Sequence, residues 1–226
     1  MNDAFRIANN KKLKKWYSWR LHLAVNVLLL LTAMAIVCRQ LRAFTFGFNE
    51  GAALFLFFHI WAIAEYGIHR FILHGDIFAR LKFYAEHTIF HHGYFTQQDM
   101  TLEVPIDLNR ILLFTSDLLV VIGLDFALSF LFSRLVNFQF ALLFCLAGLF
   151  YIAAYELIHA ICHAKRPSRS KFLGHLFSFF SGSIQHHRLH HDRKQMRSAN
   201  FAVVFPYIDR LFASTCRPAA RGADYV

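Results

Sequence analysis

Four long apolar stretches constrain the fold of this chain more than any other feature of its sequence. They are residues 21–38, 51–68, 111–132 and 136–158. As a helix, the first stretch would extend about 27 Å, close to the roughly 30 Å hydrocarbon core of a bilayer. A helix satisfies its own backbone polar groups, which lipid requires. We therefore expect four transmembrane helices.

The composition agrees with a membrane protein and excludes several other classes. Of the 226 residues, 57% are hydrophobic and 27 are phenylalanine. The four cysteines form no C-x-x-C pair, which argues against a disulfide framework and a cysteine zinc site. The net charge of +10 favours contact with anionic membrane lipids and not with nucleic acid. A G-x-G-x-x-G or P-loop pattern is missing, so the sequence indicates no nucleotide or flavin site.

The first apolar stretch has an alternative interpretation as a signal peptide. Ala33-Met34-Ala35 resembles a cleavage site. A transmembrane helix is favoured because the apolar run is long and another span follows within a few residues. The apolar segment 172–184 near the C-terminus is too short to cross, so we expect it at the interface or re-entering the membrane.

The positive charges predict the orientation of the four spans. With the N-terminus in the cytoplasm, 21 of the 24 Lys and Arg residues lie on the cytoplasmic side, leaving Arg39, Arg42 and Arg134 outside. Residues 69–110 and 159–226 would then form a cytoplasmic cap. The fold class we expect is an all-α membrane protein with four transmembrane helices and a histidine-rich cap, built as a single domain over residues 1–226.

Eleven of the 14 histidines fall in four clusters, and this topology places all of them at the cytoplasmic face. The clusters are His69/His74, His87/His91/His92, His159/His163 and His186/His187/His190/His191. Neutral imidazole is the commonest metal ligand among side chains. For the isolated His22, His59 and His175, interfacial or packing roles are expected, since His59 lies ten residues before His69.

The spacings within the clusters indicate a site for two metals. His159 and His163 are four apart, so on a helix they share a face and could bind one metal. His69 and His74 are five apart, which predicts that they reach two different metals. In the triplets His87/His91/His92 and His187/His190/His191, the two adjacent rings point in different directions on a helix. Each triplet could therefore bridge a two-metal site. Ten ligands give five per metal, and an octahedral iron would keep one open position.

Neutral imidazoles supply no negative charge, so nearby carboxylates are expected to hold ring N–H groups and balance the metals. The candidates are Glu65, Glu86, Glu156 and Asp192. Within the third span, Asp117 and Asp125 could line a substrate cavity, pair with another helix or serve simple polar packing.

The histidine motifs resemble, in order, those of the fatty acid hydroxylase/sterol desaturase superfamily. They are Glu-Tyr-Gly-Ile-His69-Arg-Phe-Ile-Leu-His74, His87-x-x-x-His91-His92, Tyr-Glu-Leu-Ile-His159-Ala-Ile-Cys-His163 and His186-His187-Arg-Leu-His190-His191, followed by Asn200-Phe201-Ala202 and Ile208-Asp209-Arg210-Leu211-Phe212. The third motif is most similar to the fatty acid 2-hydroxylase branch. The chain departs from the common pattern at Ala202, at Ile208 and in the three-residue spacing after His87.

The resemblance implies a non-haem di-iron monooxygenase that hydroxylates a fatty acyl chain, with C-2 as the candidate position. It implies ten metal ligands: His69, His74, His87, His91, His92, His159, His163, His187, His190 and His191. His186 would instead form a hydrogen bond nearby. The implied partners are O2, a lipid or fatty acyl substrate and a separate electron donor, either a ferredoxin or a cytochrome b5-like protein. Zinc could replace iron on the same nitrogens.

Two alternatives remain open from the sequence. One is a hydroxylase or desaturase of the same superfamily that acts on a sterol, carotenoid or alkyl lipid. The other is a non-enzymatic metal-binding or metal-transporting membrane protein. The short chain and the lack of a fused donor domain favour a bacterial inner membrane over the endoplasmic reticulum as the location.

Overall fold

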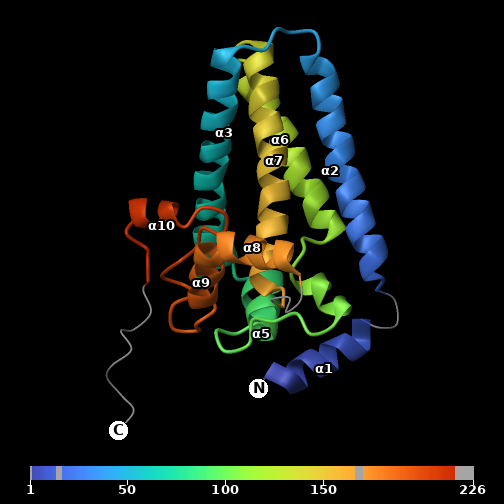
Figure 1. Cartoon of the computed structure of the whole chain (residues 1–226), viewed down its shortest axis with the longest axis vertical. Coiled ribbons are helices and arrows are strands. Elements are labelled where there is room, and N and C mark those ends of the chain that lie inside the picture. Colours follow the sequence, from blue (N-terminus) through green and yellow to red (C-terminus); the bar gives the residue numbers. More distant parts are fainter. Residues whose placement is uncertain (1, 14–16, 166–169, 217–226) are drawn as a thin grey trace.

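The computed structural model describes residues 2–13, 17–165 and 170–216, and within these ranges all regular secondary structure is helical (Figure 1). The longer helices are α1 (Asn2–Leu13), α2 (Trp19–Leu41), α3 (Phe48–Gly67), α6 (Thr115–Phe132), α7 (Phe138–His163), α8 (Lys171–Phe179) and α9 (Ser181–His190). The short elements are η1 (Ile68–Leu73), η2 (Asp76–Phe78), α4 (Lys82–Tyr84), η3 (Ala85–His91), α5 (His92–Tyr94), η4 (Pro105–Arg110) and α10 (Tyr207–Leu211).

Among the described residues, four segments are long and apolar enough to cross a membrane, as the sequence predicts, which indicates a multi-pass membrane protein. They are Trp19–Leu41, Phe48–Leu73, Pro105–Phe132 and Phe138–His163. The third predicted span does not begin as one helix at residue 111. Residues 111–114, which follow the short η4, are not helical, and α6 starts only at Thr115. Segment 172–184 is not among the candidate spans; it forms α8 and the start of α9.

Helix α7 occupies the centre of the bundle and packs against α2, α3 and α6. Small residues allow close packing at two points. Ala147 is fully buried against α3. Gly148 faces α6, where an added Cβ would lie 2.6 Å from Oδ1 of Asp125. Asp125 is fully buried beside Cys145 and Ser129, so it pairs with the neighbouring helix, one of the roles expected for it.

The remaining elements gather at one end of the bundle, opposite the short α2–α3 and α6–α7 connections (Figure 1). Helix α1 lies beneath this cap and contacts α5 and η4. Helix α8 exposes Phe172 and Phe179. Because α7 continues without a break to His163, its last turn carries a histidine pair out of the bundle into the cap.

Candidate metal centre

All ten histidines predicted as metal ligands are buried and lie together in the cap. Each side chain is at most 9% exposed. Two groups of potential ligand nitrogens form, each with all its atoms within 4.8 Å of one another. The first contains His69, His74, His87, His92 and His190, and the second contains His91, His159, His163 and His187. The tenth ring, His191, joins the second group, since its Nε2 lies 3.1 Å from Nε2 of both His91 and His187.

The assignment of His69 and His74 to different metals is wrong. Both lie in the first cluster, with ring centroids 5.2 Å apart. The prediction assumes α-helical geometry, but α3 continues as the π-helix Ile68–Leu73, which ends directly before His74. Hydrogen bonds from residue i to i+5 bring residues five apart onto one face. The π-helix Ala85–His91 has the same effect on His87 and His92, which also share the first cluster.

The two histidine triplets connect the clusters, because their adjacent members diverge as predicted. His91 lies in the second cluster and His92 in the first. On α9, His190 contributes to the first cluster, whereas His187 belongs to the second. The four-residue spacing of His159 and His163 places both rings in the second cluster. Two elements of the cap therefore hold both clusters in one rigid unit.

Backbone carbonyls orient most of the rings through their Nδ1 atoms. In the second cluster, His91 donates to Arg110 O at 2.6 Å, His159 to Ile111 O at 3.1 Å, His163 to Met100 O at 2.9 Å and His191 to Phe95 O at 2.7 Å. In the first cluster, His69 donates to Phe201 O and His190 donates to Ala199 O at 2.9 Å. His74 contacts Thr88 Oγ1 at 3.0 Å, and that hydroxyl donates to Leu73 O.

These contacts fix the tautomers, because a carbonyl oxygen can only accept a hydrogen bond. Nδ1 must carry the proton, so in a neutral ring Nε2 carries a lone pair. The Thr88 hydroxyl donates its proton to Leu73 O, so it too can only accept from Nδ1 of His74. Yet Nε2 of His91 lies 3.2 Å from Nε2 of His159, and Nε2 of His74 lies 3.0 Å from Nε2 of His190. Lone pairs that face one another at this distance repel unless a cation lies between them. The donor set therefore fits a bound metal in each cluster.

The alternative, protonated imidazoles, is disfavoured by burial. Burial lowers the pKa of His74 to about 2 and the pKa of His91 to about 4. Burial, with neighbouring rings adding to it, also holds the pKa well below the usual value for His87, His92, His187, His190 and His191. Burial thus favours the neutral form of these seven rings, and neutral imidazole is the form that metals bind. Nδ1 of His92 and Nδ1 of His187 are buried without a hydrogen-bond partner among the described residues.

The four carboxylates predicted to support the rings are placed differently from one another. Glu65 is the nearest, with Oε1 3.7 Å from Nδ1 of His69. Glu86 forms an ion pair with Arg110 at 2.7 Å, and Glu156 accepts the backbone N–H of Leu113. Asp192 accepts the backbone N–H of Lys194 after α9. Among the described residues, the last three form no hydrogen bond or ion pair with any of the ten rings, because loop carbonyls take the ring N–H groups instead.

His186 forms a hydrogen bond nearby, and its partner is a residue that the sequence search for ligands missed. Its Nε2 lies 2.9 Å from Oδ2 of the fully buried Asp209. Asp209 also accepts the backbone N–H groups of Phe201 and Ala202 at 3.0 and 2.7 Å. It thereby holds the carbonyl that receives His69. The closing motifs that contain Phe201 and Asp209 were the only sequence signal for this contact.

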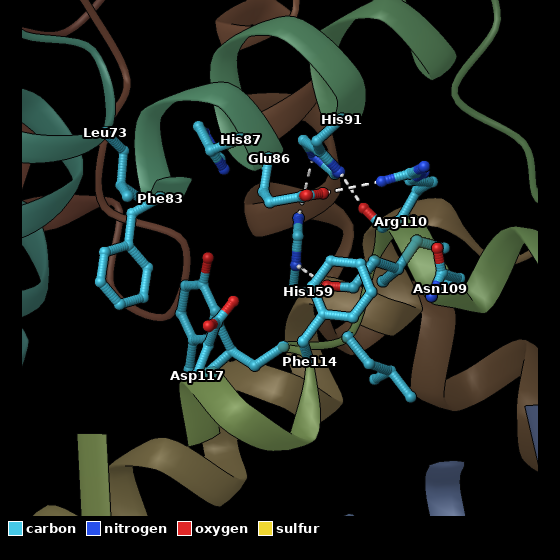
Figure 2. Close-up of a pocket in the computed structure, with 14 residues that line it drawn as sticks. Leu73, Phe83, Glu86, His87, His91, Asn109, Arg110, Phe114, Asp117 and His159 are labelled. Carbon is cyan, nitrogen blue, oxygen red and sulfur yellow. Dashed lines mark hydrogen bonds and ion pairs between the residues drawn. The ribbon is translucent and has the colours of Figure 1, made fainter. Parts of the chain in front are cut away.

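A cavity of about 70 Å³ opens beside both clusters (Figure 2). It reaches His87 of the first cluster and His91 and His159 of the second. Apolar side chains make up much of the wall: Leu73, Phe83, Ile111, Leu112, Leu113 and Phe114. The ion pair between Glu86 and Arg110 at 2.7 Å also lines it, as does Asp117, whose carboxylate lies 2.6 Å from Nζ of Lys82. Asp117 thus lines a cavity, one of the roles that the sequence left open for it.

The isolated histidines lie outside both clusters. His22 bonds to Leu113 O, and His175 is exposed on α8. His59 stacks on Phe205 with ring centroids 5.3 Å apart. These contacts are the packing and surface roles expected for them.

Comparison with known proteins assigns the chain to a family. The family model for fatty acid hydroxylase matches residues 54–214, which include all ten clustered histidines and Asp209. The chain belongs to the fatty acid hydroxylase family. This hydroxylase-family chain also resembles a solved structure described as full-length Scs7p with only the hydroxylase domain visible. The two share 21% identity with a TM-score of 0.58, over 90% of this chain and 68% of that one. No curated protein sequence matches significantly.

Proposed function

We propose that the protein is an O2-dependent di-iron hydroxylase that acts on a fatty acyl chain. One iron would be held by His69, His74, His87, His92 and His190, and the other by His91, His159, His163, His187 and His191. The observation that carries this proposal is the set of Nε2 atoms that face one another at about 3 Å in neutral, buried rings. Membership of the fatty acid hydroxylase family supports the substrate class.

The overall reaction converts a methylene group into a hydroxymethylene group. One C–H bond is broken and one C–O and one O–H bond form, while the second oxygen atom leaves as water with two protons and two electrons from the donor. When bound, the iron pair supplies the redox chemistry that activates oxygen toward an unactivated C–H bond.

The protein would position the substrate, keep water away from the reacting carbon and hold the ring protons on fixed atoms. The cavity beside His87, His91 and His159 would receive the acyl chain, because its apolar wall excludes water from the reacting carbon. The carbonyls of Arg110 and Ile111 keep the Nδ1 protons of His91 and His159 in place, so these rings present the same tautomer throughout the reaction.

The charged groups of the cavity lie close to the histidines, which favours oxidation near the polar end of the substrate. Glu86 directly precedes His87, and Arg110 bonds to His91 through its carbonyl and to Glu86 through its guanidinium. A substrate whose carbonyl or carboxylate binds Arg110 would present its first methylenes to the clusters. This geometry supports C-2 over positions far along the chain.

We further propose that the cap faces the cytoplasm and receives electrons there. The excess of Lys and Arg on this side supports the orientation. Arg188, Arg193, Lys194 and Arg197 are exposed on the cap. Arg188 follows His187 directly on α9, so an acidic ferredoxin or cytochrome b5-like donor attracted to these charges would dock near the metal pair. A bacterial inner membrane fits this arrangement.

The test is mass spectrometry of total lipids from cells with and without expression, with oxygen and a donor supplied. We expect acyl chains heavier by one oxygen, and fragmentation that places the hydroxyl at C-2. A modified sterol, carotenoid or alkyl lipid, or a new double bond, would assign a different substrate or reaction within the superfamily. Unchanged lipids with metal bound would favour the non-enzymatic metal-binding alternative.

A further inference from the structure

Arg6 on α1 is a buried cation in a part of the chain that precedes the family match at residue 54. Its side chain is 7% exposed, although α1 lies on the outside of the cap. Burying a guanidinium is costly unless its N–H groups are paired. The contacts that offset this cost all lie in one segment of the cap, residues 95–107.

The guanidinium holds this segment at three points. Nη1 donates to Asp99 Oδ2 at 2.9 Å, and Nη2 donates to Thr101 O at 3.1 Å and to Asp107 Oδ2 at 2.7 Å. The guanidinium also lies over the ring of Phe95, with Cζ 5.5 Å from its centroid. Asp107 is fully buried and additionally accepts the backbone N–H groups of Glu103 and Val104. One side chain thus fixes the two ends and the middle of an irregular segment.

The same segment orients two rings of the second cluster. Phe95 O accepts Nδ1 of His191 at 2.7 Å, and Met100 O accepts Nδ1 of His163 at 2.9 Å. A further bond joins the backbone N–H of Leu102 to the carbonyl of His163 at 2.8 Å. The position of these carbonyls depends on the path of the segment, since residues 95–104 form no helix of their own.

The first cluster has separate supports. Three of its five rings bond through Nδ1, to Phe201 O, Ala199 O and Thr88 Oγ1, and none of these groups belongs to the segment that Arg6 holds. An effect of Arg6 on metal binding should therefore be confined to one cluster.

We propose that Arg6 is a positioning residue for the second metal, acting through residues 95–107 on His163 and His191. The proposal rests on the metal centre under Proposed function. It makes α1, a helix that precedes the region matched by the family model, part of the assembly of the site. Loss of a group that orients metal ligands from outside the coordination shell typically weakens metal binding about 10- to 100-fold.

The experiment measures Fe²⁺ binding to the full chain in detergent by anaerobic equilibrium dialysis and metal analysis, with the wild type expected to bind two ions. Arg6→Gln should leave one ion bound as in the wild type and weaken the other about 10- to 100-fold. Arg6→Lys keeps the charge but cannot form the three-point fork, so it should recover part of the loss. Lys11→Gln, a change at an exposed cation on the same helix, is the matched control and should bind like the wild type.

A second pair of variants identifies the affected cluster. In a His69→Ala background, which disables the first cluster, Arg6→Gln should weaken the remaining ion. In a His159→Ala background it should change nothing. If Arg6→Gln fails to fold, Asp99→Asn removes only the contact to a partly exposed carboxylate and should give a smaller loss in the same cluster.

Two results would overturn the inference while leaving the proposed function standing: unchanged binding of both ions by Arg6→Gln, or equal weakening of both. The second would mean that Arg6 merely stabilises the cap as a whole. A wild-type chain that binds no iron, and no metal at all, would instead refute the proposed function and the inference with it.

Discussion

Nε2 of His186 lies 2.9 Å from Oδ2 of Asp209, and this contact joins α9, which carries the clustered histidines His187 and His190, to the segment that closes the cap. The carboxylate of Asp209 also accepts hydrogen bonds from Ser214 and from the backbone of Phe201 and Ala202. His186 therefore supports the site through Asp209 without belonging to either cluster.

The first prediction concerns Asp209. Asp209→Asn should lower the free energy of unfolding by about 2–4 kcal/mol, because a fully buried carboxylate with four donors is lost. Denaturant unfolding of the detergent-solubilised chain measures this. Asp192→Asn, which changes a carboxylate that only accepts a local backbone N–H, should change stability by less than about 0.5 kcal/mol. Equal effects of the two changes would contradict the role of Asp209.

The pH dependence of that difference follows from the pKa of Asp209. Burial opposes ionisation, but hydrogen bonds from His186, Ser214 and the backbone outweigh it and lower the pKa. A lowered folded-state pKa gives stability that is present above the unfolded value near 3.9 and is lost as the pH falls through the folded value. The wild type should therefore exceed Asp209→Asn in stability by a constant amount from pH 5 to 8, and the difference should shrink below about pH 4. A difference that grows in acid would contradict this assignment.

The second prediction separates ligands from bystanders. His163→Ala and His190→Ala remove one ring from each cluster and should abolish hydroxylated product without preventing membrane insertion. Each should also reduce bound iron, since a buried site loses one of five donors. His175→Ala, at an exposed ring on α8, is the matched control and should retain full activity. Full activity in either cluster variant would refute the ten-ligand assignment.

The third prediction tests the cavity as the acyl site. Leu73→Trp places a larger side chain in a space of about 70 Å³ and should reduce product at least tenfold. The substitution keeps the backbone carbonyl of Leu73 that accepts the Thr88 hydroxyl, and the Leu73 side chain only lines the cavity, so iron content should stay at the wild-type level. Leu124→Trp changes an exposed leucine on α6 and should leave both quantities unchanged. Loss of iron in Leu73→Trp would show that the change disrupts the clusters and not the substrate path.

The fourth prediction concerns the charged group of the cavity. Arg110→Gln keeps the backbone carbonyl that holds His91 but removes the guanidinium proposed to bind the polar end of the substrate. A hydrogen bond to a charged group is worth about 1.5–3 kcal/mol, so KM should rise about 10- to 100-fold. Steady-state kinetics with a purified donor measures this, and Arg134→Gln at the opposite end of the bundle is the control. An unchanged KM would place the polar end elsewhere.

The sequence predicts the spans to within a few residues, because hydropathy and length are properties of each segment alone. It also predicts that the histidines meet, since the topology carries every cluster to one face. Other features depend on contacts between distant segments and have no local signature. The loop carbonyls of Phe95 and Met100, which hold two rings, belong to residues that no ligand pattern marks.

The π-helices explain the one error in the assignment of the histidines. A five-residue spacing diverges on an α-helix, yet His69 and His74 converge because the backbone hydrogen-bond pattern changes at Ile68. The change lies at the end of a span, where the chain leaves the bundle and enters the cap. The sequence overpredicts hydrogen bonds from the rings to carboxylates for a related reason. Irregular segments around the clusters leave backbone carbonyls free to accept the ring N–H groups instead.

The last prediction tests the orientation of the membrane helices. Single cysteines are introduced at Thr45, in the exposed α2–α3 connection, and at Gln98, on the cap, in a chain from which the native cysteines are removed. If the cap is cytoplasmic, a membrane-impermeant maleimide should label Thr45→Cys in intact cells and Gln98→Cys only after lysis. The positive charges require this pattern, because 21 of 24 Lys and Arg residues belong to the N-terminal segment, the cap and the tail. The reverse labelling would place the histidine clusters, and with them the electron donor, on the outer face.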